Sequence, residues 1–365
     1  MDFNFSSLKE HFNLYSRQIA DFGQKTMIKL SKLRVLILFV RGLGIEISKN
    51  IILAGPKSVS IFDPTITKIN DLNSNFYLHE KDVGKKRRDE AVIKDLKILN
   101  DYVEVDFLKE NSLENIIEKI PKNYDVVVLT ELLSQSKSIE IDEICRKNNI
   151  PFIYTAVLGL TGFIFSDFGK EHKITEKSNK ELKKYMIKNI TKETNGICEI
   201  IKNDKNPGLF NEKFVIFKNI EGMKELNFEK LKRETKIKYK TKTSFYIGDT
   251  SKFSEYIKGG YVQEVVLPEI KNYKSLKERL EKPYDYYLAT EEELCDEQNK
   301  NIKEDNTFLD CDNSENIGKN EILFITFKII MDFYEKNNRL PELNNSEEAN
   351  EITQQTFELY NALKK

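Results

Sequence analysis

The sequence lacks tryptophan altogether and has only three histidines and four cysteines among its 365 residues. So few histidines leave a histidine-based metal site or catalytic triad little to build from. The cysteines have no C-x-x-C spacing, which argues against a zinc site or a disulfide framework and favours a reducing compartment. These four residues are Cys145, Cys198, Cys295 and Cys311.

An excess of charge of one sign and long apolar runs are also absent. The 58 basic and 59 acidic residues give a net charge of −1, so there is no bulk basic field of the kind that attracts nucleic acid. No apolar run reaches about 18 residues, and no basic-then-apolar leader opens the chain. We therefore expect a soluble, intracellular protein with no nucleic-acid partner and no membrane partner.

What the sequence does contain is a strand, a glycine turn, a helix and a second strand within residues 34–63. Residues 35–40 are apolar without alternation, as in a central parallel strand covered on both faces. Gly42 and Gly44 follow, and residues 45–53 place apolar side chains at helical spacing before a Gly-Pro stop. The second strand, 59–62, ends at Asp63, where a dinucleotide-binding fold holds a ribose hydroxyl.

The glycine pattern of this turn is incomplete. A dinucleotide-binding turn reads G-x-G-x-x-G, but Phe39 and Arg41 stand at the earlier glycine positions, before Gly44. A phenylalanine does not let a phosphate approach the backbone as glycine does. The sequence therefore predicts a retained fold that has lost its nucleotide, in which Gly42, Gly44 and Asp63 serve the turn and its packing.

Strands continue to alternate with helices up to residue 155, which predicts an α/β fold with a doubly wound, Rossmann-like parallel sheet. From residue 159 the alternating apolar pattern and glycines indicate antiparallel strands, hence a small inserted β-rich domain. Residues 322–334 are too apolar for a helix left in water, which predicts the start of a helical bundle. The predicted domains are 1–168 and 246–290 for the α/β domain, 169–245 for the insertion, 291–320 for an acidic disordered linker and 321–365 for the bundle.

Several blocks of sequence resemble the N-terminal part of eukaryotic ubiquitin-activating enzymes, members of the ThiF/MoeB-like superfamily. They are YSRQ at 15–18, RGLGIEISKNIILAG at 41–55, DLNSNFYLHEKDVGKKR at 71–87, GFIFSDFG at 162–169 and GDTSKFSEYIKGG at 248–260. The first three are shared with the smaller subunit of the SUMO-activating heterodimer, but that subunit lacks the β-rich insertion and its exit. The resemblance implies an inactive adenylation domain, the first catalytic-cysteine half-domain inserted in it, and the opening of a four-helix bundle.

The resemblance also implies that ATP chemistry is absent from this half. Active members carry N-R-Q where this chain has N-S-N, so Ser74 replaces an arginine that grips phosphate. Arg87 stands in the place of the catalytic lysine, and the metal-holding aspartate appears as Glu131 or is lost. Adenylyl transfer depends on positioned cations that neutralise developing charge. We therefore expect a degenerate nucleotide site, marked by Arg41, Gly42, Gly44, Asp63, Ser74 and Arg87.

Arg17 has a different implied role. In the family, the arginine of the YSRQ segment crosses to the ATP bound by the other, active half and acts as an arginine finger in trans. A guanidinium suits that task because it is always charged and can grip phosphate with two parallel donors. The alternative for Arg17 is a local surface ion pair. Cys198 lies in the insertion, but the family's thioester cysteine lies in the other half-domain, so we expect Cys198 to be structural.

The implied cofactors are ATP and Mg²⁺ in the full enzyme, bound by the active half, with none for this chain alone. The implied partners are that active half, ubiquitin and ubiquitin-conjugating enzymes, in the cytoplasm and nucleus. One alternative is a regulatory subunit of a SUMO- or NEDD8-activating heterodimer, which the insertion disfavours. A remote alternative is an NAD-dependent oxidoreductase, which Phe39, Arg41 and the lack of a hydride-site histidine disfavour.

Overall fold

The computed structural model describes residues 14–159, 161–174, 182–201, 214–232, 234–241, 243–265, 267–281, 314–342 and 345–363. Most of the acidic linker predicted at 291–320 lies outside these residues. The last part of that segment is helical, because α12 spans Ser314–Asn337. The predicted boundary at 321 is therefore wrong: the apolar pattern marked where the helix packs, and the helix begins earlier, in a polar stretch.

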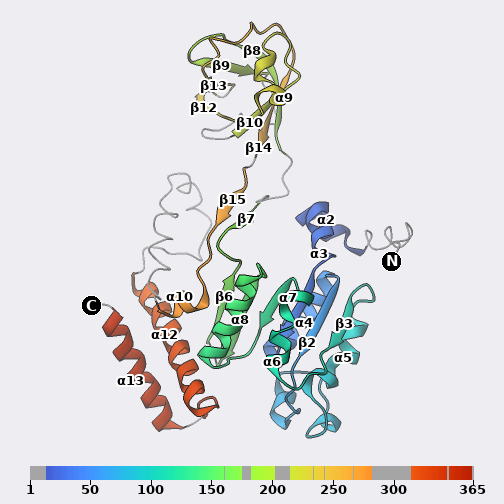
Figure 1. Cartoon of the computed structure of the whole chain (residues 1–365), viewed down its shortest axis with the longest axis vertical. Helices are drawn as coiled ribbons and strands as arrows, with labels where there is room; N and C mark the ends of the chain where they lie inside the picture. The colour runs from blue at the N-terminus through green and yellow to red at the C-terminus, as the bar shows by residue number, and fades with distance from the viewer. Residues whose placement is uncertain are drawn as a thin grey trace. The chain divides into compact units, whose positions relative to one another are not determined.

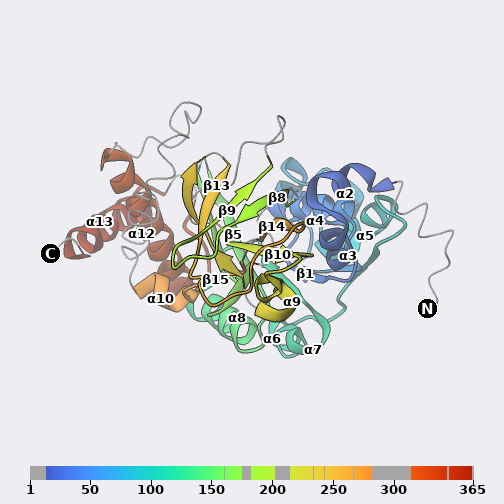
Figure 2. The ribbon, with the colours of Figure 1, turned by 90° about the horizontal axis from the view of Figure 1, so that it is seen from above.

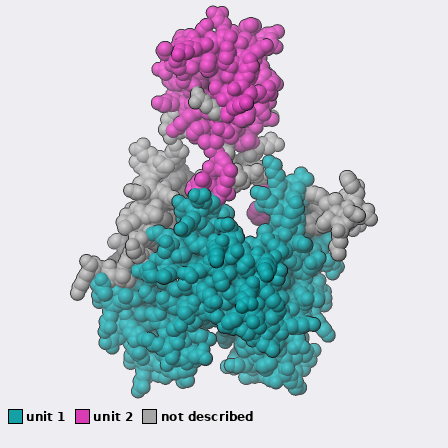
Figure 3. Space-filling view, viewed as in Figure 1, with its two compact units in different colours: residues 1–19, 24–172, 272–365 teal, residues 20–23, 173–271 magenta. Residues whose placement is uncertain are grey.

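The chain forms two compact units (Figure 3). Unit 1 comprises residues 1–19, 24–172 and 272–365, and unit 2 comprises residues 20–23 and 173–271. The prediction ended the insertion at 245, whereas the chain stays in unit 2 up to residue 271. The reason is that β14, Tyr261–Val265, pairs with strands of the inserted sheet rather than returning to the parallel one.

Unit 1 is built on a six-stranded sheet with the order β3-β2-β1-β4-β5-β6. All neighbours pair in parallel except β6, which runs antiparallel to β5. This arrangement, visible in Figure 1, confirms the predicted Rossmann-like fold. The strands are β1 (Arg34–Leu38), β2 (Ser58–Phe62), β3 (Glu104–Phe107), β4 (Val126–Leu129), β5 (Phe152–Leu158) and β6 (Thr161–Asp167).

Helices cover both faces of this sheet (Figure 1, Figure 2). On one face α4 (Gly42–Ala54) and α5 (Arg88–Ile98) bury alternate side chains of β1 and β2. On the other face α8 (Gln135–Lys147), α10 (Leu276–Glu281) and α12 pack around β4, β5 and β6. Further helices described in the unit are α3 (Gln24–Leu30), α6 (Leu113–Ile117), α7 (Ile120–Asn123) and α13 (Ser346–Leu363), with 3-10 turns at Ile69–Asn73 and Glu80–Asp82.

The two described cysteines lie in the hydrophobic cores. Cys145 on α8 is fully buried in unit 1. Cys198 is fully buried in the core of unit 2, and burial raises the pKa of both thiols. A buried thiol with a raised pKa is a poor nucleophile. The structural role expected for Cys198 is therefore consistent with its place in the fold.

Unit 2 is a seven-stranded antiparallel sheet with the order β11-β10-β14-β8-β9-β13-β12. Its edge strands β11 and β12 are separated in sequence by Ile237 alone, which is buried, so the sheet curls until its two edges nearly meet. The strands are β8 (Lys184–Ile190), β9 (Gly196–Ile200), β10 (Phe214–Lys218), β11 (Thr235–Lys236), β12 (Lys238–Thr241), β13 (Ser244–Gly248) and β14, with α9 (Phe228–Leu231) and a 3-10 turn at Lys224–Leu226. A separate two-stranded ladder joins β7 (His172–Ile174) and β15 (Glu269–Lys271).

A buried acidic pair lies where α8 meets β6 and α10. Asp142 accepts a hydrogen bond from the backbone N of Leu276 at 2.7 Å, and Arg146 forms an ion pair with Asp167. Arg146 also donates to the carbonyl oxygen of Tyr273 at 2.7 Å. Burial, together with the nearby charge of Asp167, raises the pKa of Asp142 to about 7. This cluster ties the returning segment of the chain to the sheet.

The raised pKa of Asp142 predicts a pH-dependent stability. The folded state holds this proton more tightly than the unfolded chain does, so the free energy of unfolding falls as pH rises from about 4 to about 7. We expect Asp142→Asn, whose amide mimics the protonated acid, to be more stable than the wild type at pH 8 by roughly 1–3 kcal/mol. Urea denaturation at pH 5 and pH 8 measures this difference.

The control for this prediction is Asp106→Asn, because the side chain of Asp106 is 74% exposed. It should change stability little at either pH. An Asp142→Asn effect of the same size at pH 5 and pH 8 would contradict the assignment of the proton to this buried pair.

Candidate functional site

The turn between β1 and α4 keeps the backbone of a glycine turn without its first glycine. Phe39 has a positive φ of 70°, a left-handed conformation that bulky residues rarely adopt. Its ring packs edge-on against Phe62 at the end of β2. A Cβ added at Gly44 would collide with the carbonyl oxygen of Phe39 and the hydroxyl of Thr130. The turn is therefore tight, and Gly44 is required by packing, as predicted.

A loop after β2 closes over the start of α4. A Cβ added at Gly42 would lie 2.7 Å from the Cβ and 2.8 Å from the Oγ of Ser74. Asn75 is fully buried and donates to the carbonyl oxygen of Val40 at 3.0 Å. The loop therefore packs against the first turn of α4, the place where a phosphate binds in a nucleotide fold.

Asp63 points into the turn rather than toward solvent. It is fully buried and accepts hydrogen bonds from the backbone N of Val40 and of Thr65, each at 3.1 Å. Its Oδ2 also lies 3.3 Å from Nη1 of Arg88. These contacts hold the turn together and leave Asp63 no exposed oxygen for a ribose hydroxyl.

Arg88 is the central cation of this region, a role that was not predicted from the sequence. Only 5% of its side chain is exposed, and its Nε donates to Asp71 at 2.8 Å. Burial lowers the pKa of Arg88, but the hydrogen bond to Asp71 and the charge of Asp63 outweigh that effect and raise it overall. A buried arginine needs carboxylate partners of this kind. The adjacent residues Arg87 and Arg88 do not show, in the sequence, which of the two side chains is buried.

Arg87 and Arg41 are paired as well. Arg87 forms an ion pair with Asp89 at 2.6 Å and donates to the carbonyl oxygens of Leu108, Lys109 and Glu110. Arg41 is half exposed; its Nη1 lies 3.1 Å from Glu131 and its Nε 3.6 Å from Asp71. Neither guanidinium is left over to bind a phosphate.

The electrostatic balance of the site is unfavourable for a triphosphate. Burial raises the pKa of Glu131, and the charge of nearby Asp63 raises it further. Burial also raises the pKa of Asp89. Each of the three guanidinium groups of this cluster is paired with a carboxylate, so an incoming polyphosphate would have to compete with those carboxylates for them. Within the described ranges, no group of histidine, cysteine, aspartate and glutamate side chains could hold a metal ion.

The residues present therefore do not fit ATP bound in this sheet. Ser74 packs against Gly42 at the start of α4, and the nearby cations are already paired. What the arrangement does chemically is stabilise a tight turn by charge-assisted hydrogen bonds. The sequence identified Arg41, Ser74 and Arg87 by position; the pairing of Arg41 with Glu131 and of Arg87 with Asp89 is visible only in the structure.

Arg17 differs from these arginines. It lies at the start of α2 (Ser16–Phe22), and its side chain is exposed. Across the described residues, no carboxylate or hydrogen-bond acceptor is paired with it, whereas Arg34 of β1 is held by Asp125 at 2.8 Å. The local surface ion pair considered as an alternative for Arg17 is therefore not formed within the part of the chain described.

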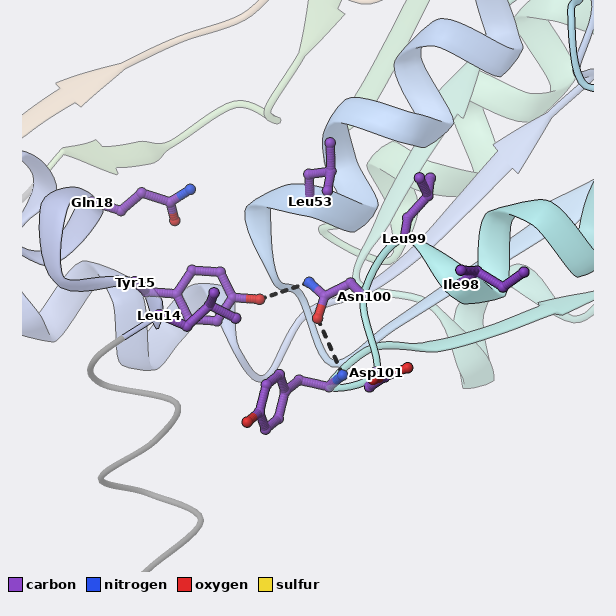
Figure 4. Close-up of a pocket in the computed structure, with 9 residues that line it drawn as sticks. Leu14, Tyr15, Gln18, Leu53, Ile98, Leu99, Asn100 and Asp101 are labelled. Carbon is purple, nitrogen blue, oxygen red and sulfur yellow. Dashed lines mark hydrogen bonds between the residues drawn. The ribbon is translucent and has the colours of Figure 1, made fainter.

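A small cavity of about 310 Å³ lies beside residues 14–19, the arm that carries Arg17 (Figure 4). Tyr15 and Gln18 of the arm face the end of α4 and the turn after α5 across it, and the Tyr15 hydroxyl points at Asn100. Its lining residues are Leu14, Tyr15, Gln18, Leu53, Ile98, Leu99, Asn100, Asp101 and Tyr102.

Comparison with known proteins gives the family. Residues 15–201, which include the six-stranded sheet and the glycine turn, match the ThiF family. The chain belongs to the ThiF family. Two further matches follow along this ThiF chain: residues 193–266 match the ubiquitin-activating enzyme E1 FCCH domain, and residues 267–360 match the ubiquitin-activating enzyme E1 four-helix bundle. The resemblance drawn from the sequence is thereby confirmed.

Similar proteins include ubiquitin-activating enzymes from several organisms. Ubiquitin-like modifier-activating enzyme 1 of Dictyostelium discoideum is 33% identical over 339 residues, covering 93% of this chain and 30% of the relative. Ubiquitin-activating enzyme E1 2 of Arabidopsis thaliana is 37% identical over 280 residues, covering 76% and 25%. The human ubiquitin-like modifier-activating enzyme 1 is 35% identical over 270 residues, covering 74% and 25%. This ThiF chain therefore spans less than a third of the length of these relatives.

The family match and the fold agree on the order of parts in this ThiF protein. The Rossmann-like sheet, the inserted antiparallel sheet and the C-terminal helices appear in the same order as the three matched families. Among the described residues, no helix combines the length and apolar character needed to cross a bilayer.

Proposed function

We propose that this chain is the non-catalytic N-terminal half of a ubiquitin-activating enzyme. In the whole enzyme, ATP and ubiquitin would give ubiquitin adenylate, then a thioester, then transfer to a conjugating enzyme. The observation that carries the proposal is the contrast between a nucleotide turn filled by its own side chains and the exposed, unpaired Arg17. This half would supply Arg17 to the ATP and Mg²⁺ site of the active half.

The exposed end of the parallel sheet supports packing against that active half. In doubly wound folds both faces of a sheet are normally covered. Here Ile164 on β6 is 80% exposed. Val157 on β5, two residues after the partner of Ile164, Thr155, is 57% exposed. The relatives extend far beyond this chain's length, so an apolar surface of the active half is the occupant we propose.

The inserted unit supports ubiquitin, rather than SUMO or NEDD8, as the modifier. Its matched residues, 193–266, belong to a domain named for ubiquitin-activating enzymes. We assign to it part of the ubiquitin-binding surface. We also propose that the whole enzyme acts in the cytoplasm and nucleus, with ubiquitin-conjugating enzymes as later partners. A pull-down with the active part of the ubiquitin-, SUMO- and NEDD8-activating enzymes would show whether this chain works with ubiquitin or is a subunit of a SUMO- or NEDD8-activating heterodimer.

The nicotinamide alternative has a separate test. A turn filled by Ser74 and a buried Asp63 leave no place for a dinucleotide, so NADH fluorescence should not change on adding the protein. A saturable enhancement of NADH fluorescence would revive the oxidoreductase hypothesis.

The experiment that tests the proposed function is ubiquitin-dependent ATP–pyrophosphate exchange. We expect none from this chain alone and full exchange when the active half is present. Exchange by the chain alone, lost in Asp63→Asn, would overturn the proposal, because it would place the working nucleotide site in this sheet.

A further inference from the structure

The arm that carries Arg17 is fixed to the sheet domain by the tyrosine two residues before it. Tyr15 is 3% exposed, and its hydroxyl accepts a hydrogen bond from Nδ2 of Asn100 at 2.7 Å (Figure 4). The aromatic ring lies over Gly55, where an added Cβ would be 2.5 Å from both Cζ and the hydroxyl of Tyr15. Gly55 has a φ of 86°, so two independent constraints keep a glycine there.

Asn100 is itself held by the fold. It is 8% exposed, and its Nδ2 also donates to the carbonyl oxygen of Ile52 at 2.8 Å, near the end of α4. Its Oδ1 accepts from the backbone N of Tyr102 at 3.1 Å. The amide thus joins the end of α4, the turn after α5 and the arm, and its orientation cannot change without breaking a bond.

The helix that presents Arg17 starts from this anchor. The backbone N of Ile19 donates to the carbonyl oxygen of Tyr15 at 2.9 Å, which is the first hydrogen bond of α2. In the described part of the chain nothing holds the guanidinium of Arg17 itself. The starting position of the Arg17 side chain is therefore determined by the backbone of α2, and Tyr15 fixes that backbone to the sheet domain.

We propose that Tyr15 and Asn100 are positioning residues that hold Arg17 where it can reach the phosphates bound by the active half. This inference rests on the proposed function of Arg17. An arginine acting across an interface contributes only if its starting position is already defined, since misplacement by about 1 Å can cost up to about 100-fold in rate. The hydrogen bond between Tyr15 and Asn100 defines that starting position within the non-catalytic half.

The test is a double-mutant cycle in the enzyme that contains this chain and the active half. Tyr15→Phe keeps the ring over Gly55 and removes the hydrogen bond between the Tyr15 hydroxyl and Asn100. We expect it to lower the kcat of ATP–pyrophosphate exchange by about tenfold when Arg17 is present and to add no further loss in the Arg17→Ala background. Asn100→Ala removes the same bond from the other side, together with the bonds to Ile52 and Tyr102, so its loss of kcat should be at least as large and should likewise depend on Arg17.

The matched control is Tyr154→Phe, which removes another fully buried tyrosine hydroxyl from the same sheet domain, 3.5 Å from Ser138. It should leave kcat unchanged. A Tyr15→Phe loss that is equal in both backgrounds, or a loss matched by Tyr154→Phe, would mean that the bond serves only stability, and the anchor proposal would fail. An Arg17→Ala variant that exchanges normally would instead refute the proposed function of Arg17.

Discussion

Replacing Arg17 by alanine is expected to lower the kcat of ubiquitin adenylation by about 100- to 1,000-fold in the whole enzyme. Arg17 is exposed and, among the described residues, forms no ion pair, so its removal leaves the fold of this chain intact. Negative charge that develops on the phosphates would lose one positioned cation. The measurement is ubiquitin-dependent ATP–pyrophosphate exchange at saturating ATP and ubiquitin.

Two further variants sharpen this prediction. Arg17→Lys keeps the charge but loses the pair of parallel donors, so it should recover only part of the rate. Arg41→Ala removes a half-exposed arginine that is paired with Glu131 in the closed turn and should leave kcat unchanged. Equal losses in Arg17→Ala and Arg41→Ala would show that general charge, rather than a specific finger, matters.

Replacing Gly44 by alanine is expected to destabilise the chain by about 3–5 kcal/mol. The new methyl group would collide with the carbonyl oxygen of Phe39 and the hydroxyl of Thr130. Both belong to the ends of central strands, since Thr130 donates to the carbonyl oxygens of Leu38 and Phe39. Relief would require moving α4 away from the sheet. Urea denaturation followed by circular dichroism measures the loss.

Gly84→Ala is the control for this variant. Gly84 has a φ of 69° but no neighbouring atom within 4 Å of an added Cβ, so only backbone strain of about 1–2 kcal/mol is expected. If both variants lose the same stability, the close approach at Gly44 would not be the cause.

The fold could be predicted from the sequence because burial leaves a strong pattern. Strands covered on both faces appear as continuous apolar runs, and the strands predicted within residues 35–40 and 59–62 correspond to β1 and β2 of the parallel sheet. The end of α4 at Gly55, which has a left-handed backbone, and the apolar helix α12 were equally predictable from the sequence. These features depend on neighbours in the sequence.

The details of the site depend on neighbours in space and could not be predicted. Arg87 and Arg88 are adjacent, yet Arg88 alone is buried between Asp63 and Asp71. Neither the left-handed backbone of Phe39 nor the loop that sets Ser74 over Gly42 has a sequence signal. The end of the insertion was missed for a similar reason, because an antiparallel strand looks the same whichever sheet it joins.

Equilibrium titration of this chain with MgATP tests the central claim most directly. A site with a Kd of about 50 μM would raise the free energy of unfolding by about 2.7 kcal/mol at about 5 mM ligand, and this would be clear in a urea denaturation curve. Because its own side chains fill the turn, the chain is predicted to show no change in its denaturation midpoint. Saturable stabilisation of that size would contradict the account.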